Sequence, residues 1–321
     1  MVKKVGIPHA LLYYQFFPAW KTFFEQLGAE VVVSPPTNKT ILNLGVSRGV
    51  QDTCLPVKVF FGHAVSLVDK CDLIFVPAVT SLGKKSYNCS KLIGLPNMVQ
   101  ALIPESPPLI APEINYEKGR YNLYWNMYKT GRHFTSNPFR LRKAVAAGWK
   151  SVLDYRGRMF GEGITPFQAL EGQPPPETES SSLTVAVIGH PYIIYDEYVS
   201  HRLISRLRKM KVRVVTPEMI SQDELEAATK RLVGTPHWSF EADIIGSGGY
   251  YLEKGVDGII TVAAFGCGPD SMMTSMVQHR ARELEVPLLP LSLDEHSSEG
   301  GLLTRLEAFL DMVERRGKVC L

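Results

Sequence analysis

The sequence predicts an α/β protein made of two domains, each built around a parallel sheet. The chain has 321 residues, which is long for one hydrophobic core and sufficient for two. Short apolar segments typical of buried strands alternate with longer segments that carry apolar residues at helical spacing. Residues 173–182 contain three consecutive prolines, acidic residues and serines, which is typical of a solvated linker between domains.

Residues 1–112 are expected to form the N-terminal α/β domain. A strand over Lys3–Pro8, a helix over Phe16–Leu27 and a strand over Ala29–Ser34 make a β-α-β unit, which favours a parallel strand pair. The pattern then predicts a short helix over Thr37–Gly45, a helix over Val57–Val68, a strand over Asp72–Pro77 and a loop over Ala78–Ser90.

Residues 113–172 differ in composition from the rest of the chain and are expected to be a helical insertion. The segment is aromatic and basic, and its helices are separated near Asn137-Pro138, the later one running from Arg140 to about Gly161. Aromatic residues interleaved with cations can bind single-stranded nucleic acid. The net charge of +3 is small for this length, so we expect helices that pack on the main body and no nucleic-acid partner.

Residues 183–321 are expected to form the C-terminal α/β domain. Its first strand over Leu183–Gly189, helix over Val199–Met210 and strand over Val212–Thr216 repeat the N-terminal layout. Gly6–Tyr14 also resembles Gly189–Tyr195, although any two β-α-β units share part of this pattern. The remaining pattern predicts helices over Ser221–Leu232, Phe240–Lys254, Ser271–Leu284 and Leu302–Arg315, and strands over Gly258–Phe265 and Pro287–Leu293.

Three of the five cysteines occupy similar settings. Cys54 precedes a proline at the expected start of a helix, where free N–H groups and the helix dipole favour a thiolate. Cys267 lies between two glycines, after a strand and before a helix, and Cys89 lies in a loop that follows a strand. Cys71 and Cys320 do not fit, because Cys71 is at the opposite end of its unit and Cys320 is next to the C-terminus.

The three similar cysteines predict a metal site of the soft-ligand type. Ligands of open parallel sheets bind outside the carboxyl ends of the strands, so Cys54, Cys89 and Cys267 meet in one cleft if the two sheets face each other. Three thiolates suit an iron–sulfur cluster better than a hard cation and leave a fourth iron open. The residues alone leave a second reading, three unrelated buried cysteines.

Other residues are candidates for contacts to a substrate or around the cluster. His190 and Tyr192 follow the carboxyl end of a strand, and Lys58 lies in the Cys54 helix. His63, in the same helix, either belongs to the site or satisfies a buried hydrogen bond. Further candidates are Tyr195, Ser47-Arg48 and Glu295-His296. The glycine-rich turns Gly246–Gly249 and Gly266–Gly268 match neither a dinucleotide-binding motif nor a P-loop.

The sequence also bears on the cellular compartment. No apolar run approaches the about 20 residues that span a bilayer, so we expect no membrane partner. The N-terminal residues lead into a strand pattern that is too short for a signal sequence, and the odd cysteine count argues against a disulfide framework. A cytoplasmic protein is therefore expected.

A family resemblance rests on four groups of residues: Cys54-Leu-Pro-Val-Lys58 with Gly62-His63, Tyr87-Asn-Cys89, Gly266-Cys-Gly-Pro-Asp-Ser271, and Asp294-Glu-His296 with Glu299, Thr304 and Arg305. Together they resemble the uncharacterised family associated with CoA-enzyme activases. That family is related to the iron–sulfur component of 2-hydroxyacyl-CoA dehydratases and to double-cubane-cluster reductases. The resemblance covers nearly the whole chain.

The resemblance implies two Rossmann-like domains with a helical insertion, and one [4Fe–4S] cluster held by Cys54, Cys89 and Cys267. It also implies a separate activator, an ATPase of the actin/Hsp70 type with its own iron–sulfur cluster. Dehydratase relatives pair two similar subunits, so a homodimer is expected by analogy. The chain lacks the further cysteines that a second cluster would need, and no CoA pocket is visible in the sequence.

The expected function is an ATP-dependent low-potential reductase or dehydratase-like component, in which the cluster accepts an electron and reduces a small substrate at or near an open iron. Two alternatives remain. One is a non-enzymatic iron–sulfur carrier, scaffold or sensor. The other is a metal-free α/β binding module whose cysteines are buried.

Overall fold

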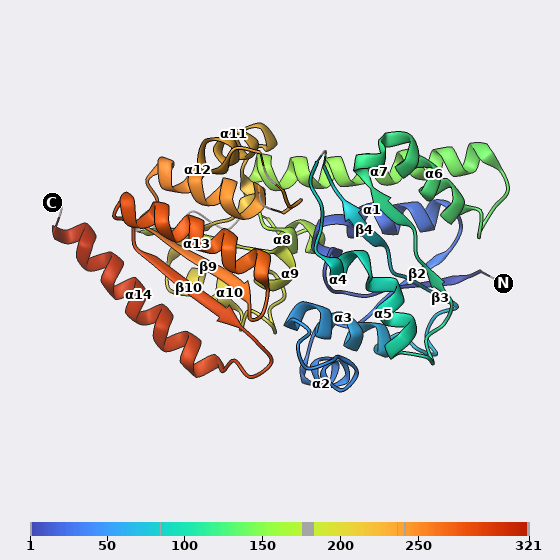
Figure 1. The fold of residues 1–321 in the computed structure, drawn as a ribbon, viewed down its shortest axis with the longest axis horizontal. Helices are drawn as coiled ribbons and strands as arrows, with labels where there is room; N and C mark the ends of the chain where they lie inside the picture. The colour runs from blue at the N-terminus through green and yellow to red at the C-terminus, as the bar shows by residue number, and fades with distance from the viewer. Residues whose placement is uncertain (1, 84, 175–182, 236, 241, 320–321) are drawn as a thin grey trace. The chain divides into compact units, whose positions relative to one another are not determined.

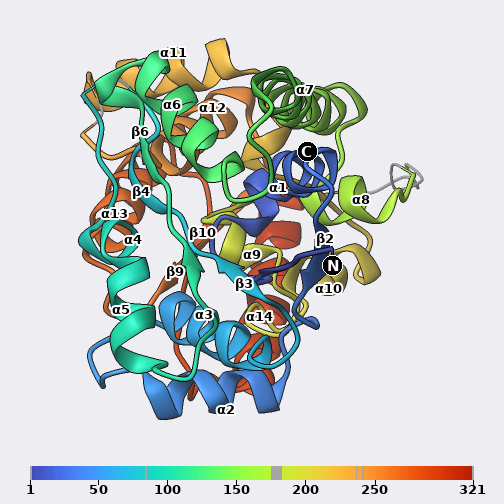
Figure 2. The same cartoon turned by 90° about the vertical axis from the view of Figure 1, so that its right-hand side faces the viewer.

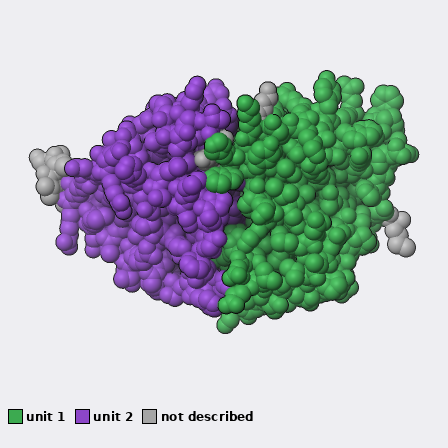
Figure 3. Space-filling view, viewed as in Figure 1, with its two compact units in different colours: residues 1–157, 237–239 green, residues 158–236, 240–321 purple. Residues whose placement is uncertain are grey.

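The computed structural model describes residues 2–83, 85–174, 183–235, 237–240 and 242–319 (Figure 1). Most of the predicted linker, from residue 175 on, and Cys320 lie outside these residues. The chain divides into two compact units, coloured in Figure 3: unit 1 has residues 1–157 and 237–239, and unit 2 has residues 158–236 and 240–321. The domain boundaries and the cleft expected from the sequence stay predictions.

Unit 1 contains a parallel sheet, as the sequence predicts, and the sheet has four strands. Its order is β2 (Glu30–Val33), β1 (Lys4–Ile7), β3 (Leu73–Phe75) and β5 (Leu109–Ile110). The helices of this unit are α1 (Tyr13–Gln26), α2 (Lys39–Arg48), α3 (Leu55–Ser66), α4 (Ser90–Ile93), α5 (Leu95–Leu102), the 3₁₀ turn η1 (Tyr116–Lys118), α6 (Arg120–Gly131) and most of α7 (Pro138–Glu162).

The core of unit 1 lies between α1 and the sheet. Phe23 and Phe24 of α1 are buried one turn after Trp20, as their spacing predicts. The Phe24 and Trp20 rings each lie 5.2 Å from the ring of Phe75 in β3. These aromatic contacts fix α1 over the sheet and leave the carboxyl ends of the strands to the loops that follow them.

Helices α2 and α3 lie side by side (Figure 2), and their closest approach, called the crossing below, occurs at two glycines. A Cβ atom on Gly45 would lie 1.8 Å from the carbonyl oxygen of Lys58, and one on Gly62 would lie 1.9 Å from the carbonyl oxygen of Ile41. Only glycine allows backbones to approach this closely. The crossing therefore fixes the position of α3, which begins directly after Cys54.

The predicted loop over Ala78–Ser90 is wrong in its first residues. Ala78–Ser81 forms β4, which pairs in parallel with β6 (Glu113–Asn115). A partner more than 30 residues away leaves no mark on a local pattern. Residues 237–239, here called the strap, lie along the next part of this segment: Tyr87 N donates to His237 O at 3.0 Å, and Ser239 N donates to Tyr87 O at 3.0 Å.

Unit 2 contains a second four-stranded parallel sheet with the order β8 (Val212–Val215), β7 (Leu183–Gly189), β9 (Gly258–Ala264) and β10 (Leu288–Leu293). When the strands of each sheet are numbered in chain order, their spatial order is second, first, third, fourth in both sheets. A structural repeat requires this agreement. The strand order reverses between β1 and β3 and between β7 and β9. Ligands of such sheets bind outside the carboxyl ends at this point.

The helical elements of unit 2 are α8 (Pro166–Glu171), α9 (Pro191–Ile194), α10 (Leu203–Lys209), η2 (Pro217–Met219), α11 (Gln222–Val233), the π-helical turn η3 (Ala242–Gly246), α12 (Ser247–Lys254), α13 (Gly268–Glu283) and α14 (Glu299–Val319). The predicted helix over Val199–Met210 begins late. The Asp196 side chain accepts hydrogen bonds from the N–H groups of Tyr198 and Val199 at 3.0 Å, which forms a turn instead. His201 and Arg202 follow with left-handed backbone.

A large apolar core lies beneath β7 and β9. Ile188, Ile259 and Met273 are at most 1% exposed within it, and Val277 of α13 is fully buried beside them. Among the described helices, none combines the length and the hydropathy that crossing a membrane requires.

Candidate functional site

Each of the three cysteines singled out by the sequence is the residue immediately before a helix. Cys54 precedes α3, Cys89 precedes α4 and Cys267 precedes α13. Each has extended backbone, each is half-buried, and none caps its helix through a side-chain hydrogen bond. The predicted helix start at Cys54 is confirmed, and the helix after Cys89 was not foreseen because α4 has only four residues.

The turns that carry Cys54 and Cys89 lie in the same part of unit 1. Lys91 of α4 donates through Nζ to the carbonyl oxygen of Asp52 at 3.1 Å, two residues before Cys54. Phe60 of α3 and Leu92 of α4 line one small apolar pocket near the carboxyl ends of β1 and β3. The two segments that carry Cys54 and Cys89 therefore lie near the carboxyl ends of the strands of the first sheet.

Lys58 is buried inside α3, with 4% of its surface exposed. Its Nζ donates to the carbonyl oxygen of Gln51 at 3.1 Å, and its Cγ lies 3.0 Å from the position of a Cβ on Gly49. The side chain thus holds the turn that leads into Cys54. Its predicted contact with a substrate stays a prediction.

His63 satisfies its hydrogen bonds inside unit 1. Its Nδ1 is 2.8 Å from Ser34 Oγ and its Nε2 is 2.9 Å from Thr37 Oγ1. Burial, with a smaller contribution from the nearby His9, lowers the pKa of His63 to about 3. Burial alone lowers the pKa of His9 to about 4. Both rings are therefore neutral near pH 7, and the hydrogen-bonding reading of His63 agrees with these contacts.

Unit 2 places His190 beside the helix that follows Cys267. His190 precedes α9 at the end of β7, and its Nε2 lies 2.5 Å from Oδ1 of Asp270, in the first turn of α13. The two side chains are 4% and 1% exposed. Asp270 Oδ2 also accepts a hydrogen bond from Ala264 N at 3.2 Å. The His190 ring stacks on Tyr192, with 4.9 Å between centroids.

Asp270 belongs to the motif around Cys267 that carries the family resemblance, but sequence reasoning did not single it out as a functional candidate. It stands three residues after Cys267, a position from which an acidic side chain commonly caps its own helix. Nothing in the sequence indicates that it would contact a histidine 80 residues earlier. Its burial and its two contacts come from the pairing of β7 with β9.

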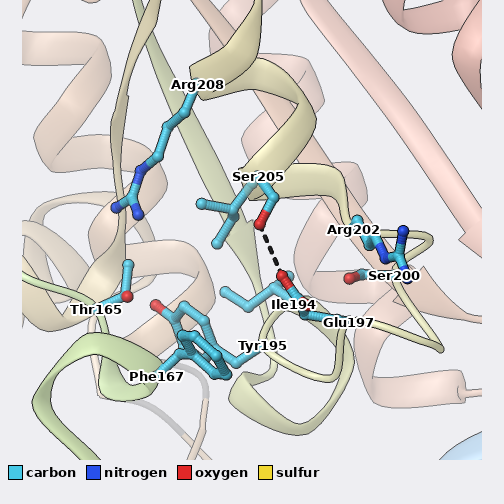
Figure 4. Close-up of a pocket in the computed structure, with 10 residues that line it drawn as sticks. Thr165, Phe167, Ile194, Tyr195, Glu197, Ser200, Arg202, Ser205 and Arg208 are labelled. Carbon is cyan, nitrogen blue, oxygen red and sulfur yellow. Dashed lines mark hydrogen bonds between the residues drawn. The ribbon is translucent and has the colours of Figure 1, made fainter. Parts of the chain in front are cut away.

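A second buried polar cluster in unit 2 includes Tyr195, another candidate from the sequence. Its hydroxyl donates to Oε2 of Glu218. Burial raises the pKa of Glu218 to about 7 and raises the pKa of Tyr195 well above its ordinary value. Tyr195 and Arg208 also line the pocket in Figure 4, where Ser205 donates to Glu197 at 2.7 Å. A volume of about 30 Å³ holds one or two waters and no substrate.

The other candidates lie outside these clusters. Arg48 pairs with Glu105, so its charge already has a carboxylate partner. His296 is exposed in the turn after β10, where its N–H donates to Asp294 at 2.9 Å. Cys71 precedes β3 at the amino end of the sheet; its Sγ donates to Leu67 O at 3.3 Å, and burial raises its pKa.

The residues 2–83, 85–174, 183–235, 237–240 and 242–319 contain no group of three or more His, Cys, Asp and Glu side chains arranged to hold a metal ion. The three cysteines are divided between the units: Cys54 and Cys89 belong to unit 1, and Cys267 belongs to unit 2.

Comparison with protein families gives two matches. Residues 198–313 match the family model described as 2-hydroxyglutaryl-CoA dehydratase, D-component. Residues 4–220 match the model described as CoA enzyme activase uncharacterised domain. No curated protein matches the chain. Both matches confirm the resemblance drawn from the motifs, and since the second one covers more than half of the residues, the chain belongs to the family of the CoA enzyme activase uncharacterised domain.

Proposed function

We propose that this protein is an iron–sulfur component of a dehydratase-type reaction system. In this proposal Cys54, Cys89 and Cys267 hold one [4Fe–4S] cluster, to which both units contribute ligands. The protein accepts low-potential electrons from an ATP-dependent activator and passes them to a small substrate. The two family matches support the dehydratase-family role, and the cluster and the electron transfer are the further steps proposed here.

The observation that carries the proposal is the shared setting of the three cysteines. Each is half-buried, directly precedes a helix and makes no side-chain hydrogen bond that caps it. Thiolates are the usual protein ligands of iron–sulfur clusters. The donor set therefore fits a cluster, and Cys71 does not, because burial raises its pKa and favours the thiol.

When bound, such a cluster stores an electron at low potential, and three protein ligands leave one iron open to a small molecule. The chain's own residues support the ligands. Lys58 holds the turn before Cys54 through Gln51, and His190 contacts Asp270 in the helix that Cys267 begins. Both are buried, which favours a supporting role, whereas the half-buried Tyr192 is the better candidate for a substrate contact.

The proposed partner is an activator ATPase of the actin/Hsp70 type that carries its own iron–sulfur cluster. The match to the family model whose description names CoA enzyme activases supports an activator as the partner. A homodimer and a cytoplasmic location, both expected from the sequence, belong to the same proposal.

The first experiment measures iron and acid-labile sulfide on anaerobically purified, reconstituted protein, with EPR of the dithionite-reduced form. Wild type is expected to hold about four irons per chain. Cys54→Ala, Cys89→Ala and Cys267→Ala should each lose the cluster, and Cys71→Ala should keep it as the matched cysteine control. Iron-free wild type, or equal iron in all four variants, contradicts the proposal.

A second experiment separates a reductase from a carrier. Cyanide, a small ligand of iron, is added to the reduced protein, and the EPR spectrum is recorded again. A change of g values indicates an open iron, as the proposal requires. An unchanged spectrum favours the non-enzymatic carrier, in which every iron is already ligated.

A further inference from the structure

The turn between β9 and α13 exposes its backbone on both sides of Cys267. Phe265 is 68% exposed, Gly266 has a φ of +74°, and Gly268 has nothing within 4 Å of a Cβ position. Such a turn loses much conformational entropy on folding, so the hydrogen bonds at its ends decide how well it is held. One of them runs from Ser271 Oγ to the carbonyl oxygen of Cys267 at 2.8 Å.

Ala264, the last residue of β9, is the anchor of this turn. Its carbonyl oxygen accepts a hydrogen bond from Cys267 N at 3.1 Å, and its N–H donates to Asp270 Oδ2 at 3.2 Å. The turn is thus closed from both ends by one backbone unit. The second bond depends on the orientation of the Asp270 carboxylate.

His190 contacts the other oxygen of that carboxylate. Its Nε2 lies 2.5 Å from Asp270 Oδ1, although the angles at this contact are not those of a hydrogen bond. In the described part of the chain, Nδ1 of His190 has no hydrogen-bond partner, and the ring is held by Tyr192 and Phe240 at centroid distances of 4.9 and 5.3 Å.

We propose that His190 and Asp270 are positioning residues for Cys267. His190 holds the carboxylate of Asp270 so that it accepts the Ala264 N–H, and the first turn of α13 and the Cys267 turn are fixed as a result. This positioning of Cys267 is expected in the protein with or without a bound cluster. Its benefit to cluster binding rests on the function proposed above.

Two substitutions of His190 separate a specific contact from simple packing. A glutamine amide can place an N–H near the position of Nε2, whereas an asparagine amide reaches only as far as Nδ1. His190→Gln should therefore keep the contact to Asp270, and His190→Asn should lose it. Asp270→Asn removes the carboxylate charge at constant shape. His279→Gln, on the exposed part of α13, is the matched control.

The readouts are taken on metal-free protein. Hydrogen exchange of peptides covering residues 264–271 should be about tenfold faster in Asp270→Asn and His190→Asn, because a hydrogen bond to a charged group is worth at least one decade in a local opening equilibrium. His190→Gln and His279→Gln should match wild type. Alkylation of Cys267 by iodoacetamide should follow the same order, with Cys54 and Cys89 unchanged as internal references.

Equal exchange in the Gln and Asn variants of His190 would overturn the proposal, as would unchanged exchange in Asp270→Asn. If Asp270→Asn does not fold, ¹⁵N NMR of wild type decides: an exchange-protected proton on His190 Nε2 supports the contact, and an unprotonated Nε2 overturns it.

Reconstituted protein gives the spectroscopic arm. His190→Asn should change the EPR g values or lower iron occupancy, and His190→Gln should restore the wild-type values. Wild type without iron contradicts the proposed function and leaves the exchange and NMR tests of positioning intact.

Discussion

Units 1 and 2 have the same strand order but differ in the groups whose pKa values are shifted by burial. Beside the strand ends of unit 1, His63 is buried and His9 is half-buried, and burial lowers the pKa of both rings. In unit 2 the shifted group is the carboxyl of the half-buried Glu218, whose pKa burial raises to about 7. The shared topology determines where the loops gather, whereas the side chains buried there determine which groups have shifted pKa values.

This difference gives the two units opposite responses to pH. The folded pKa values of His9 and His63 lie below the unfolded value of 6.5, so this stability is present above pH 6.5 and is lost as pH falls toward 4 and 3. The folded pKa of Glu218 lies above its ordinary value of 4.5, so its contribution is present below pH 4.5 and is lost as pH rises through about 7.

The largest effect is expected from a substitution that destabilises one unit and leaves the other unchanged. Gly62→Ala puts a methyl group 1.9 Å from a backbone carbonyl where α2 crosses α3, so unit 1 should lose roughly 3 kcal/mol or more. Hydrogen exchange resolved by unit measures this loss. Gly157→Ala, a helical glycine with nothing within 4 Å, is the control and should stabilise by up to about 1 kcal/mol. Equal losses in both variants would contradict the close crossing.

Acid should destabilise unit 1 through His63. We expect wild-type exchange protection in unit 1 to fall between pH 6.5 and 4. His63→Gln should be less stable than wild type at pH 7.5, because the hydrogen bonds to Ser34 and Thr37 are disturbed, and should depend less on pH. The exposed His279→Gln serves as the control. An unchanged pH slope in the His63 variant argues against a buried neutral ring.

Base should act on unit 2 through Glu218. Glu218→Gln cannot ionise, so its stability relative to wild type should improve as pH rises from 4.5 to 8. Urea unfolding at four pH values, followed by exchange of unit 2 peptides, measures the trend. Glu253→Gln, on the surface, should show no such trend. A constant difference at all pH values would mean that Glu218 is already ionised in the folded protein.

The smallest expected effect concerns the strap. Ser239→Ala removes the hydrogen bond from Leu82 N to Ser239 Oγ at 3.1 Å, which should cost about 1 kcal/mol of local stability. Exchange at the Leu82 amide should rise, and unit 2 peptides should not respond. A response confined to unit 2 would contradict the assignment of the strap to unit 1.

Local pattern predicted most of the fold because apolar periodicity and strand–helix alternation recur throughout the chain. The strand over Leu183–Gly189 has the predicted bounds, and α1 and α13 differ only at their ends. The misses arise from long-range pairing, from side-chain capping or, for α4, from the shortness of the element. Strand β4 depends on β6, and the late start of α10 depends on the Asp196 turn.

The residues of the candidate site also fall into those that a local pattern predicts and those that depend on a long-range contact. Proline and glycine near Cys54 and Cys267 placed both residues at helix starts, since those residues have fixed roles in a first turn. Asp270 was not predicted as a site residue, because what distinguishes it is a contact with His190, which follows a different strand. Periodicity reports which face of an element is buried and carries no information on which distant side chain meets it.

The strap also has a consequence for how such a gene can be divided. The polypeptide crosses between units after residues 157, 236 and 239. A break anywhere in 173–182 gives an N-terminal piece that keeps residues 158–172 of unit 2 and a C-terminal piece that keeps the strap of unit 1. Neither fragment is a whole unit. Recombination that swaps one half for another must therefore replace matched pairs of segments, and we expect the two halves to be inherited as one block.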